Sequence, residues 1–257
     1  MSSENRSSPD DWDAHWDHYA ASASQNPAQR MRHDLIVHLL CETAAHRAAR
    51  VCDFGSGQGD LLQKLEVFLP DAKLLGVELS ESGVVISQRK VPRATFIVAN
   101  LFRPPPELDG YAGWATHAVC SEVLEHIDDP AAFLRLARHY LAPEAPLIVT
   151  VPGGPMSAFD RRIGHRQHFD RPKIRELLEE SGYAVERVYL AGFPLFNLYR
   201  LLVIARGKRL AQDVESQSRS SWLASVIMKL FRVLFHANVL NSPFGWQIVA
   251  VARKTSP

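Results

Sequence analysis

The sequence lacks the features of a disulfide scaffold, a membrane-spanning protein and a nucleic-acid clamp. Only three cysteines occur among 257 residues, at positions 41, 52 and 120, and none belongs to a CxxC pair. An odd number of widely spaced cysteines predicts free thiols in a reducing compartment. No apolar run is long enough to span a membrane, and the first residues are typical of neither a signal sequence nor a transit peptide. The 29 basic and 28 acidic residues nearly balance, so we expect a globular cytoplasmic protein with no nucleic-acid partner.

The composition suits one elaborated domain. Hydrophobic residues make up 46% of the chain, which is enough for one sizeable core. Residues 1–10 are polar and Ser-rich, so disorder is predicted there and a single domain over 11–257. Residues 11–48 predict N-terminal helices. Trp12, Trp16 and Tyr19 share one helix face, and Asn26-Pro27 is typical of the start of a second helix.

From residue 50 onward, short apolar segments alternate with amphipathic ones. Strands are predicted at 50–54, 73–77, 95–99, 116–120, 147–151, 183–190 and 246–252, and helices at 60–69, 82–89, 130–141 and 172–181. This alternation predicts a mostly parallel sheet with helices on both faces, over a core of residues 49–192. Ligands of such sheets bind at the carboxyl ends of the strands.

Residues 193–240 break the alternation and predict a helical insertion before the last strand, at 245–254. A helix drawn over 222–236 places Ser225, Lys229, Arg232 and His236 on one narrow stripe, so most of its circumference is apolar. Such a helix suits a buried position, a dimer interface, a substrate lid or a shallow membrane contact. The sequence leaves these readings open.

The turn after the first predicted strand, DFGSGQGD at 53–60, is rich in glycine. Its third glycine comes one residue earlier than in the dinucleotide pattern GxGxxG. Asp60 is placed to cap the next helix, and both Asp60 and Asp53 would repel a pyrophosphate. The loop therefore favours a ligand that brings positive charge, and S-adenosylmethionine carries an ammonium and a sulfonium. Gly55 and Gly57 would allow its close approach, with Asp53 helping directly or through water.

An acid follows the second predicted strand. Glu78 lies nineteen positions beyond Gly59, where Rossmann-like folds carry the acid that binds both ribose hydroxyls. The loop and this acid together predict a nucleoside site.

Several segments resemble the class I S-adenosylmethionine-dependent methyltransferases, especially the ubiquinone-biosynthesis-like group. They are VCDFGSGQGD (51–60), LLGVELS (74–80), VANLF (98–102), CSEVLEHIDDPAAFLRLARHYL (120–141), PLIVTVPGG (146–154) and GWQIVAVARK (245–254). The resemblance covers about residues 50–190 and the last strand. It implies an α/β fold, a Rossmann-like three-layer sandwich whose seven-stranded, mostly parallel sheet has an antiparallel last strand. An N-terminal helical lid and the helical insertion before the last strand would complete it.

The resemblance also implies the residues of a cofactor site. The methionine part would be held by Asp53, Gly55, Ser56, Gly57 and Ser121, the ribose by Glu78, and the adenine by Leu79, Asn100 and Leu101. Where the family usually has Asp, this chain has Asn100, whose amide oxygen can still accept a hydrogen bond. Tyr19 is similar to a lid tyrosine that reaches the cofactor carboxylate, although a tyrosine on an aromatic helix face also suits a core.

Histidines are the candidates for chemistry. S-adenosylmethionine is an activated donor, so the protein mainly aligns the displacement and excludes water. A hydroxyl acceptor also needs a base, and a histidine titrates near the working pH. His126 follows the fourth strand, and His165 and His168 follow the fifth. We therefore predict an enzyme that methylates a small-molecule acceptor, at oxygen, with a histidine as base or orienting group.

Three alternatives remain at this point. Glu122, Glu125 and His126, with a later histidine, are similar to the divalent-ion site of small-RNA 2′-O-methyltransferases, so metal-assisted O-methylation is one alternative, although many relatives with such a run need no metal. A catalytically silent S-adenosylmethionine-binding module that docks a partner through the insertion is a second. A nicotinamide-dependent oxidoreductase is a third, which Asp60 and the early glycine disfavour.

The surroundings of the loop histidines suggest the acceptor. Basic residues flank them at positions 161, 162, 166 and 171. Together with the apolar insertion they favour a partly hydrophobic or acidic small molecule.

Overall fold

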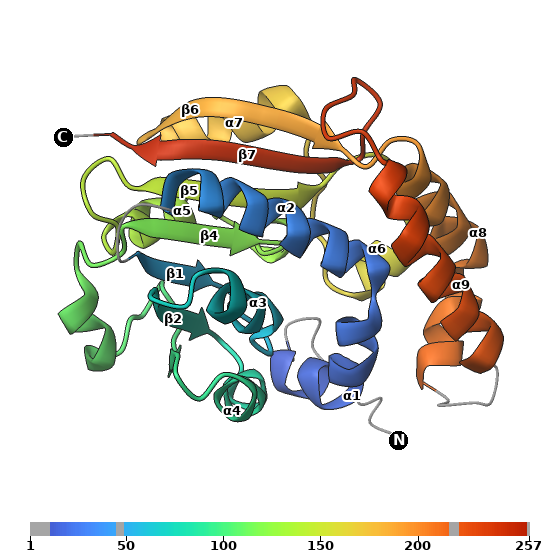
Figure 1. Cartoon of the computed structure of the whole chain (residues 1–257), viewed down its shortest axis with the longest axis horizontal. Coiled ribbons are helices and arrows are strands. Elements are labelled where there is room, and N and C mark those ends of the chain that lie inside the picture. The colour runs from blue at the N-terminus through green and yellow to red at the C-terminus, as the bar shows by residue number, and fades with distance from the viewer. Residues whose placement is uncertain (1–10, 45–48, 216–220, 256–257) are drawn as a thin grey trace, which may run out of the picture.

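A computed structural model describes residues 11–44, 49–215 and 221–255, so the predicted disorder of residues 1–10 lies outside it. The described residues form a seven-stranded sheet in the order β3-β2-β1-β4-β5-β7-β6 (Figure 1). Its strands are β1 (Arg50–Phe54), β2 (Lys73–Glu78), β3 (Thr95–Val98), β4 (His117–Ser121), β5 (Pro146–Pro152), β6 (Tyr183–Ala191) and β7 (Gln247–Lys254). Among them β7 is antiparallel to both neighbours, β5 and β6. The predicted sheet, including its antiparallel last strand, is confirmed.

The helices lie close to their predicted positions. They are α1 (Trp12–Gln25), α2 (Pro27–Ala44), α3 (Asp60–Phe68), α4 (Glu81–Lys90), α5 (Pro130–Arg138), α6 (Ala158–Arg162), α7 (Arg171–Glu180), α8 (Leu195–Glu215) and α9 (Ser221–Leu234). Short 3₁₀ turns are η1 (Pro106–Tyr111), η2 (Leu124–His126) and η3 (Phe235–Ala237). The sequence pattern did not predict α6, which interrupts the expected loop after β5.

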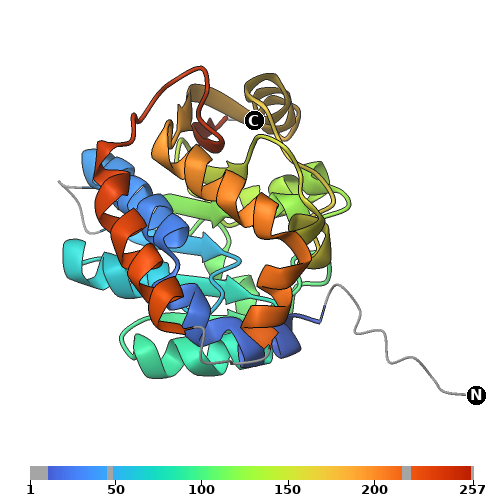
Figure 2. The same cartoon turned by 90° about the vertical axis from the view of Figure 1, so that its right-hand side faces the viewer.

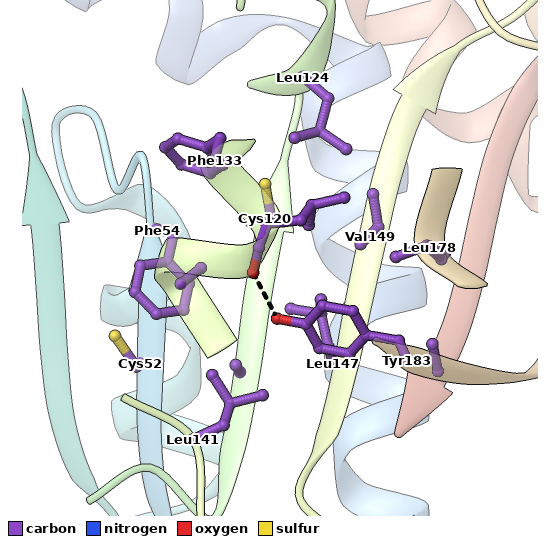
Figure 3. Packing of buried hydrophobic residues seen from close by; sticks show 14 of the residues in the cluster. Cys52, Phe54, Cys120, Leu124, Phe133, Leu141, Leu147, Val149, Leu178 and Tyr183 are labelled. Atoms are coloured by element: carbon purple, nitrogen blue, oxygen red, sulfur yellow. Dashed lines mark hydrogen bonds between the residues drawn. The ribbon is translucent and has the colours of Figure 1, made fainter. Parts of the chain in front are cut away.

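The core has two layers, one on each face of the sheet. Because successive strand residues point to opposite faces, Val51 packs with α2 and α3, whereas Cys52 packs with α5 and α7. Cys52 and Cys120 are fully buried free thiols, and burial raises their pKa well above the usual range. They are packing residues of the α5/α7 layer (Figure 3).

Tyr183 carries a polar atom into this layer. Its side chain is 1% exposed, and its hydroxyl donates a 3.0 Å hydrogen bond to the carbonyl oxygen of Leu134 on α5 (Figure 3). We expect Tyr183→Phe to lower the free energy of unfolding by about 0.5–1.5 kcal/mol, because a buried hydrogen bond is lost. Urea unfolding measures the change, with the less buried Tyr189→Phe as control. Equal stability of Tyr183→Phe and the wild type would contradict the assigned hydrogen bond.

The insertion stands beside the carboxyl ends of the parallel strands, where α1 and α6 also lie (Figures 1 and 2). It is anchored to the N-terminal helices by a separate apolar cluster, in which Phe231 and Phe235 pack with Met31 of α2 and with Phe196 of α8. The opposite side of α9 is exposed. A fully buried helix, one of the sequence-based readings, is therefore wrong for α9.

Candidate functional site

The glycine loop after β1 is shaped by positive φ angles and tight contacts. Gly55, Gly57 and Gly59 have φ of 79°, 54° and 77°, values that side chains disfavour. A Cβ atom on Gly57 would lie 2.5 Å from the Trp16 ring, and one on Gly55 would overlap a methyl group of Val123. The loop therefore requires glycine at these positions and brings bare backbone to the surface of a cavity.

The predicted capping role of Asp60 is wrong. The N-cap of α3 is Gly59, and no side chain caps this helix. The Asp60 carboxylate instead accepts hydrogen bonds from Gln29 and Gln58 and pairs with Lys90 of α4. These tertiary partners hold the carboxylate away from the cap position.

Asp53 lies one residue before the end of β1 and is a buried acid. It is 2% exposed, and its Oδ1 atom has no hydrogen-bond partner among the described residues; the same holds for Ser56 Oγ. Burial first, and then the nearby charge of Glu78, raise the pKa of Asp53 to about 7. A ligand ammonium would satisfy both the orphaned oxygen and the charge. The site thus fits the methionine end of S-adenosylmethionine.

Because the pKa of Asp53 is about 7, we expect the binding of S-adenosylhomocysteine to depend on pH. This ligand keeps the ammonium of the cofactor. The carboxylate must be ionised to pair with it, so protonation competes with the ligand below the free-state pKa of about 7. We expect the Kd to rise by up to about tenfold per pH unit below pH 7 and to level off above it. Calorimetry at pH 6, 7 and 8 measures this. Asp53→Asn should bind weakly with a flat profile, and an unchanged slope in that variant would refute the assignment.

Glu78 connects the glycine loop to the end of β2. One carboxylate oxygen accepts a 2.7 Å hydrogen bond from the Gly57 amide, and the other accepts a 2.9 Å bond from the Ser80 amide. Burial raises the pKa of Glu78, and these backbone hydrogen bonds oppose the shift. Each oxygen keeps a further lone pair, and the residue lines a cavity. Glu78 is thus placed both to hold the loop and to accept from a ligand.

The cavity beside Glu78 has a volume of about 380 Å³. It brings together the predicted adenine and ribose residues: Glu78, Leu79, Asn100 and Leu101 all line it. Leu79 is 49% exposed, so its apolar surface is available to a flat ring. The Asn100 side-chain oxygen accepts from the Phe102 amide, which fixes its orientation. We refer to this space as the nucleoside cavity.

A second cavity of about 420 Å³ adjoins it, and we refer to it as the acceptor cavity. Asp53, Gly57 and Ser121, which are predicted to hold the methionine part of the cofactor, line it together with residues of α6, α8 and α9. Trp12, Trp16, Gly55, Glu122 and His126 line both cavities. The two spaces therefore meet at His126.

Helix α1 covers this junction with two tryptophans. The Trp12 ring meets the His126 ring edge to face at 4.8 Å, and Trp16 lies against Gly57. Asp13 ties α1 to the start of α4 by accepting from the Ser80 hydroxyl at 2.6 Å. Tyr19, the predicted lid residue, belongs to α1, but its side chain lies outside the described part. Sequence reasoning placed the tryptophans on the same face and did not assign them to the site.

The three candidate histidines form a row. Ring centroids lie 4.7 Å apart for His126 and His165 and 5.5 Å apart for His165 and His168. His168 Nδ1 is 3.0 Å from the Gly154 carbonyl, which can only accept, so Nδ1 carries the proton. His168 Nε2 lies 3.2 Å from His165 Nδ1 and 3.8 Å from the Asp160 carboxylate, so the two rings and this acid form one hydrogen-bonded group.

His126 is held in a similar way. Burial lowers its pKa to about 4, and a hydrogen bond with the Gly164 backbone opposes the shift. Its Nδ1 is buried without a partner among the described residues. Burial likewise lowers the pKa of His165 to about 3. Both rings are therefore neutral near pH 7, and neither titrates near the working pH as the sequence led us to expect.

Two acids border the row and differ in their partners. Glu122 has a positive φ of 56°, rare for a residue with a side chain, and binds Gln247 at 3.0 Å with Arg32 3.7 Å away. Glu125 is fully buried, and neither of its oxygens has a partner among the described residues. Burial raises the pKa of Glu125 well above its usual range.

The predicted metal set of Glu122, Glu125, His126 and a later histidine is only partly assembled. The ligand atoms of Glu125, His126 and His165 all lie within 4.8 Å of one another, whereas Glu122 faces Arg32 and Gln247. His165 is thus the later histidine of the set, and Glu122 is absent from the group that could hold a divalent ion. In a second such group, Asp160 is already occupied by Arg200 and Ser157.

The predicted basic cluster is dispersed. Arg166 lines the nucleoside cavity and pairs with Asp128 at 3.1 Å, and Arg171 donates to Asn241. The cations that line the acceptor cavity are Arg32 and Arg200, from α2 and α8. Neither was singled out from the sequence, because only the tertiary structure brings these helices to the cavity.

Comparison with known proteins identifies the family. Residues 23–188 match a family described as a methyltransferase domain. A trans-aconitate 2-methyltransferase from Methylobacterium nodulans is 30% identical over 166 residues, 63% of this chain, and the match spans 59% of that protein's length.

Two solved structures share the fold at low identity. The [4+2]-cyclase SpnF is 16% identical with a TM-score of 0.58, covering 87% of this chain and 82% of the other. Magnesium protoporphyrin IX methyltransferase from Synechocystis PCC 6803, solved with bound S-adenosylhomocysteine, is 16% identical with a TM-score of 0.55 and the same coverage.

The fold, together with the glycine loop, Asp53 and Glu78, defines a Rossmann-like domain that suits a nucleoside cofactor with a cationic end. The chain belongs to the class I S-adenosylmethionine-dependent methyltransferases. S-adenosylmethionine is accordingly its cofactor, in agreement with the charge of the glycine loop.

Proposed function

We propose that this protein transfers a methyl group from S-adenosylmethionine to a hydroxyl oxygen of a small-molecule acceptor. The observation that carries this proposal is the junction of the two cavities at His126. When bound, the cofactor supplies a methyl group on a positively charged sulfur, which an acceptor lone pair displaces in line. An acceptor in the larger cavity would meet it beside an unprotonated imidazole nitrogen.

The chain's own residues divide the work in this proposal. In this proposal His126, which lines both cavities, is the base that takes the acceptor proton. Trp12 and Trp16 cover the junction and exclude water. His168 orients the His165 ring through their 3.2 Å hydrogen bond.

The cavity lining supports a partly apolar acceptor. The residues Phe159, Ile163, Tyr199, Val203 and Met228 line the acceptor cavity. Two cations, Arg32 and Arg200, lie among them, and Arg200 is held by Asp160 at 2.9 Å. A molecule with a polar head near His126 and an apolar body under α8 and α9 matches this distribution. An acidic acceptor, such as the trans-aconitate in the name of the Methylobacterium nodulans relative, would pair with these two cations instead.

Release of S-adenosylhomocysteine tests the proposal. Phenols with and without an alkyl tail, and trans-aconitate, are incubated with S-adenosylmethionine and the product is quantified. Turnover of a tailed phenol supports the proposal. Cofactor binding without turnover of any acceptor would favour a silent module that docks a partner.

Metal assistance is a second candidate, favoured by the unpartnered oxygens of Glu125 beside His126 and His165. A divalent ion there would acidify the acceptor hydroxyl. The base proposal predicts that EDTA leaves turnover within about twofold. Loss of turnover with EDTA, restoration by Mg²⁺ or Mn²⁺, and abolition of that restoration by Glu125→Gln would establish the metal reaction instead.

A further inference from the structure

The outer sides of α8 and α9 carry large apolar side chains in contact with solvent. On α8 these are Leu198, Leu201 and Leu202, and on α9 they are Val226, Leu230 and Val233. The spacing within each helix places its three residues on one face, and Val233 is 68% exposed. Both helices form the outermost layer on this side of the molecule (Figure 2). These six exposed residues form a larger apolar surface than single scattered residues do. Such a surface is typical of an interaction site.

The charge of this segment is one-sided. Residues 195–246 contain seven Lys or Arg residues and two acidic residues, the latter at positions 213 and 215. The chain as a whole carries a net charge of only +1. On α9 the exposed Lys229 and Arg232 flank the stripe formed by Leu230 and Val233. A basic border along an apolar stripe is typical of helices that lie on anionic lipid.

The arrangement distinguishes a lipid surface from a second copy of the chain. The centre of a dimer interface is usually depleted of charged residues, and two copies would bring these cations together. Lipid headgroups would neutralise them, while the lysine and arginine stems cover apolar surface. No helix among the described residues is long and apolar enough to cross a membrane.

The inner sides of the same helices line the acceptor cavity. Tyr199 and Val203 of α8 and Met228 of α9 face it, one turn or less from the exposed leucines. A surface seated on lipid would therefore lie next to the space proposed for an apolar acceptor.

We propose that the outer faces of α8 and α9 dock this protein on anionic membrane surfaces. The docking itself does not depend on methyl transfer; only the delivery of an acceptor from the lipid phase rests on the proposed function. Phosphatidylcholine vesicles with and without 30 mol% phosphatidylglycerol (roughly the anionic fraction that attracts basic segments) are the probes.

Vesicle co-sedimentation tests the docking with the full chain. The wild type should bind the anionic vesicles and release from them at high salt. Leu230→Gln/Val233→Gln and Lys229→Glu/Arg232→Glu should each lower the partition coefficient at least about tenfold. The matched control is Val67→Gln/Phe68→Gln, which removes an exposed apolar pair of α3, 74% and 55% exposed, and should bind like the wild type. Calorimetry with S-adenosylhomocysteine shows that each variant keeps its cofactor site.

Three results would overturn the proposal. They are absence of binding to anionic vesicles, equal binding by the α9 variants and the wild type, and a concentration-dependent dimer that Leu230→Gln/Val233→Gln dissociates. The last result would assign the surface to a second copy. Because S-adenosylhomocysteine binding is measured on the same samples, failure of the docking is distinguishable from failure of the proposed reaction.

Discussion

Replacing His126 by glutamine should lower turnover of a hydroxyl acceptor by about 10²- to 10⁴-fold, the usual contribution of a positioned base. The amide fills much of the imidazole volume but cannot take a proton at neutral pH. His126 touches both cavities and is neutral because burial lowers its pKa to about 4. Affinity for S-adenosylhomocysteine should stay within about threefold, since the cofactor is held mainly by other residues.

A comparison of hydroxyl and carboxylate acceptors tests whether His126 acts as a base. A carboxylate acceptor is already deprotonated, so His126→Gln should leave its turnover within a few fold if the histidine acts as base. His139→Gln replaces an exposed histidine at the end of α5 and serves as the matched control. An equal loss on hydroxyl and carboxylate acceptors would show that His126 shapes the site without accepting the proton.

Replacing Glu78 by alanine should weaken S-adenosylhomocysteine binding tenfold or more. Hydrogen bonds to a charged partner contribute about 1.5–3 kcal/mol each, and the acid would accept from both ribose hydroxyls. Glu78 also binds the amides of Gly57 and Ser80, so the variant loses a brace of the glycine loop as well. The exposed Glu81→Ala, at the start of α4, is the control for charge alone.

A double-mutant cycle separates the two effects of Glu78→Ala. The wild type should prefer S-adenosylhomocysteine over its 2′,3′-dideoxy analogue, and the variant should lose that preference. If the loop merely distorts, both ligands weaken equally and the preference survives. That outcome would leave Glu78 as a structural brace and remove it from the ribose site.

Much of the fold follows from local patterns. The period-two and helical segments from β1 to α5 begin or end within a few residues of their predicted limits, because each element buries one face and ends in a turn. The short helix α6 was missed because its five residues show no period. A capping box between Ser157 and Asp160, together with the Arg200 ion pair from the distant insertion, supports it.

The candidate site likewise contains residues that the sequence predicts and residues that only the tertiary structure places. The glycine loop, Asp53 and Glu78 could be predicted because they follow directly from strand ends. The cover residues could not, since a shared helix face does not show which of Trp12, Trp16 and Tyr19 reaches the cavity. The orientation of His168 depends on the Gly154 carbonyl, and the wide apolar part of α9 does not show which side tertiary packing buries.

The central claim is that S-adenosylmethionine binds at the glycine loop after β1 and at Glu78, the last residue of β2. Isothermal titration calorimetry of the full chain with S-adenosylhomocysteine, and separately with NADH, tests it most directly. Binding of S-adenosylhomocysteine at one site in the micromolar range, with no heat from NADH, is the expected result. A folded protein that binds NADH, or that binds neither ligand, would contradict the assignment of this cofactor site.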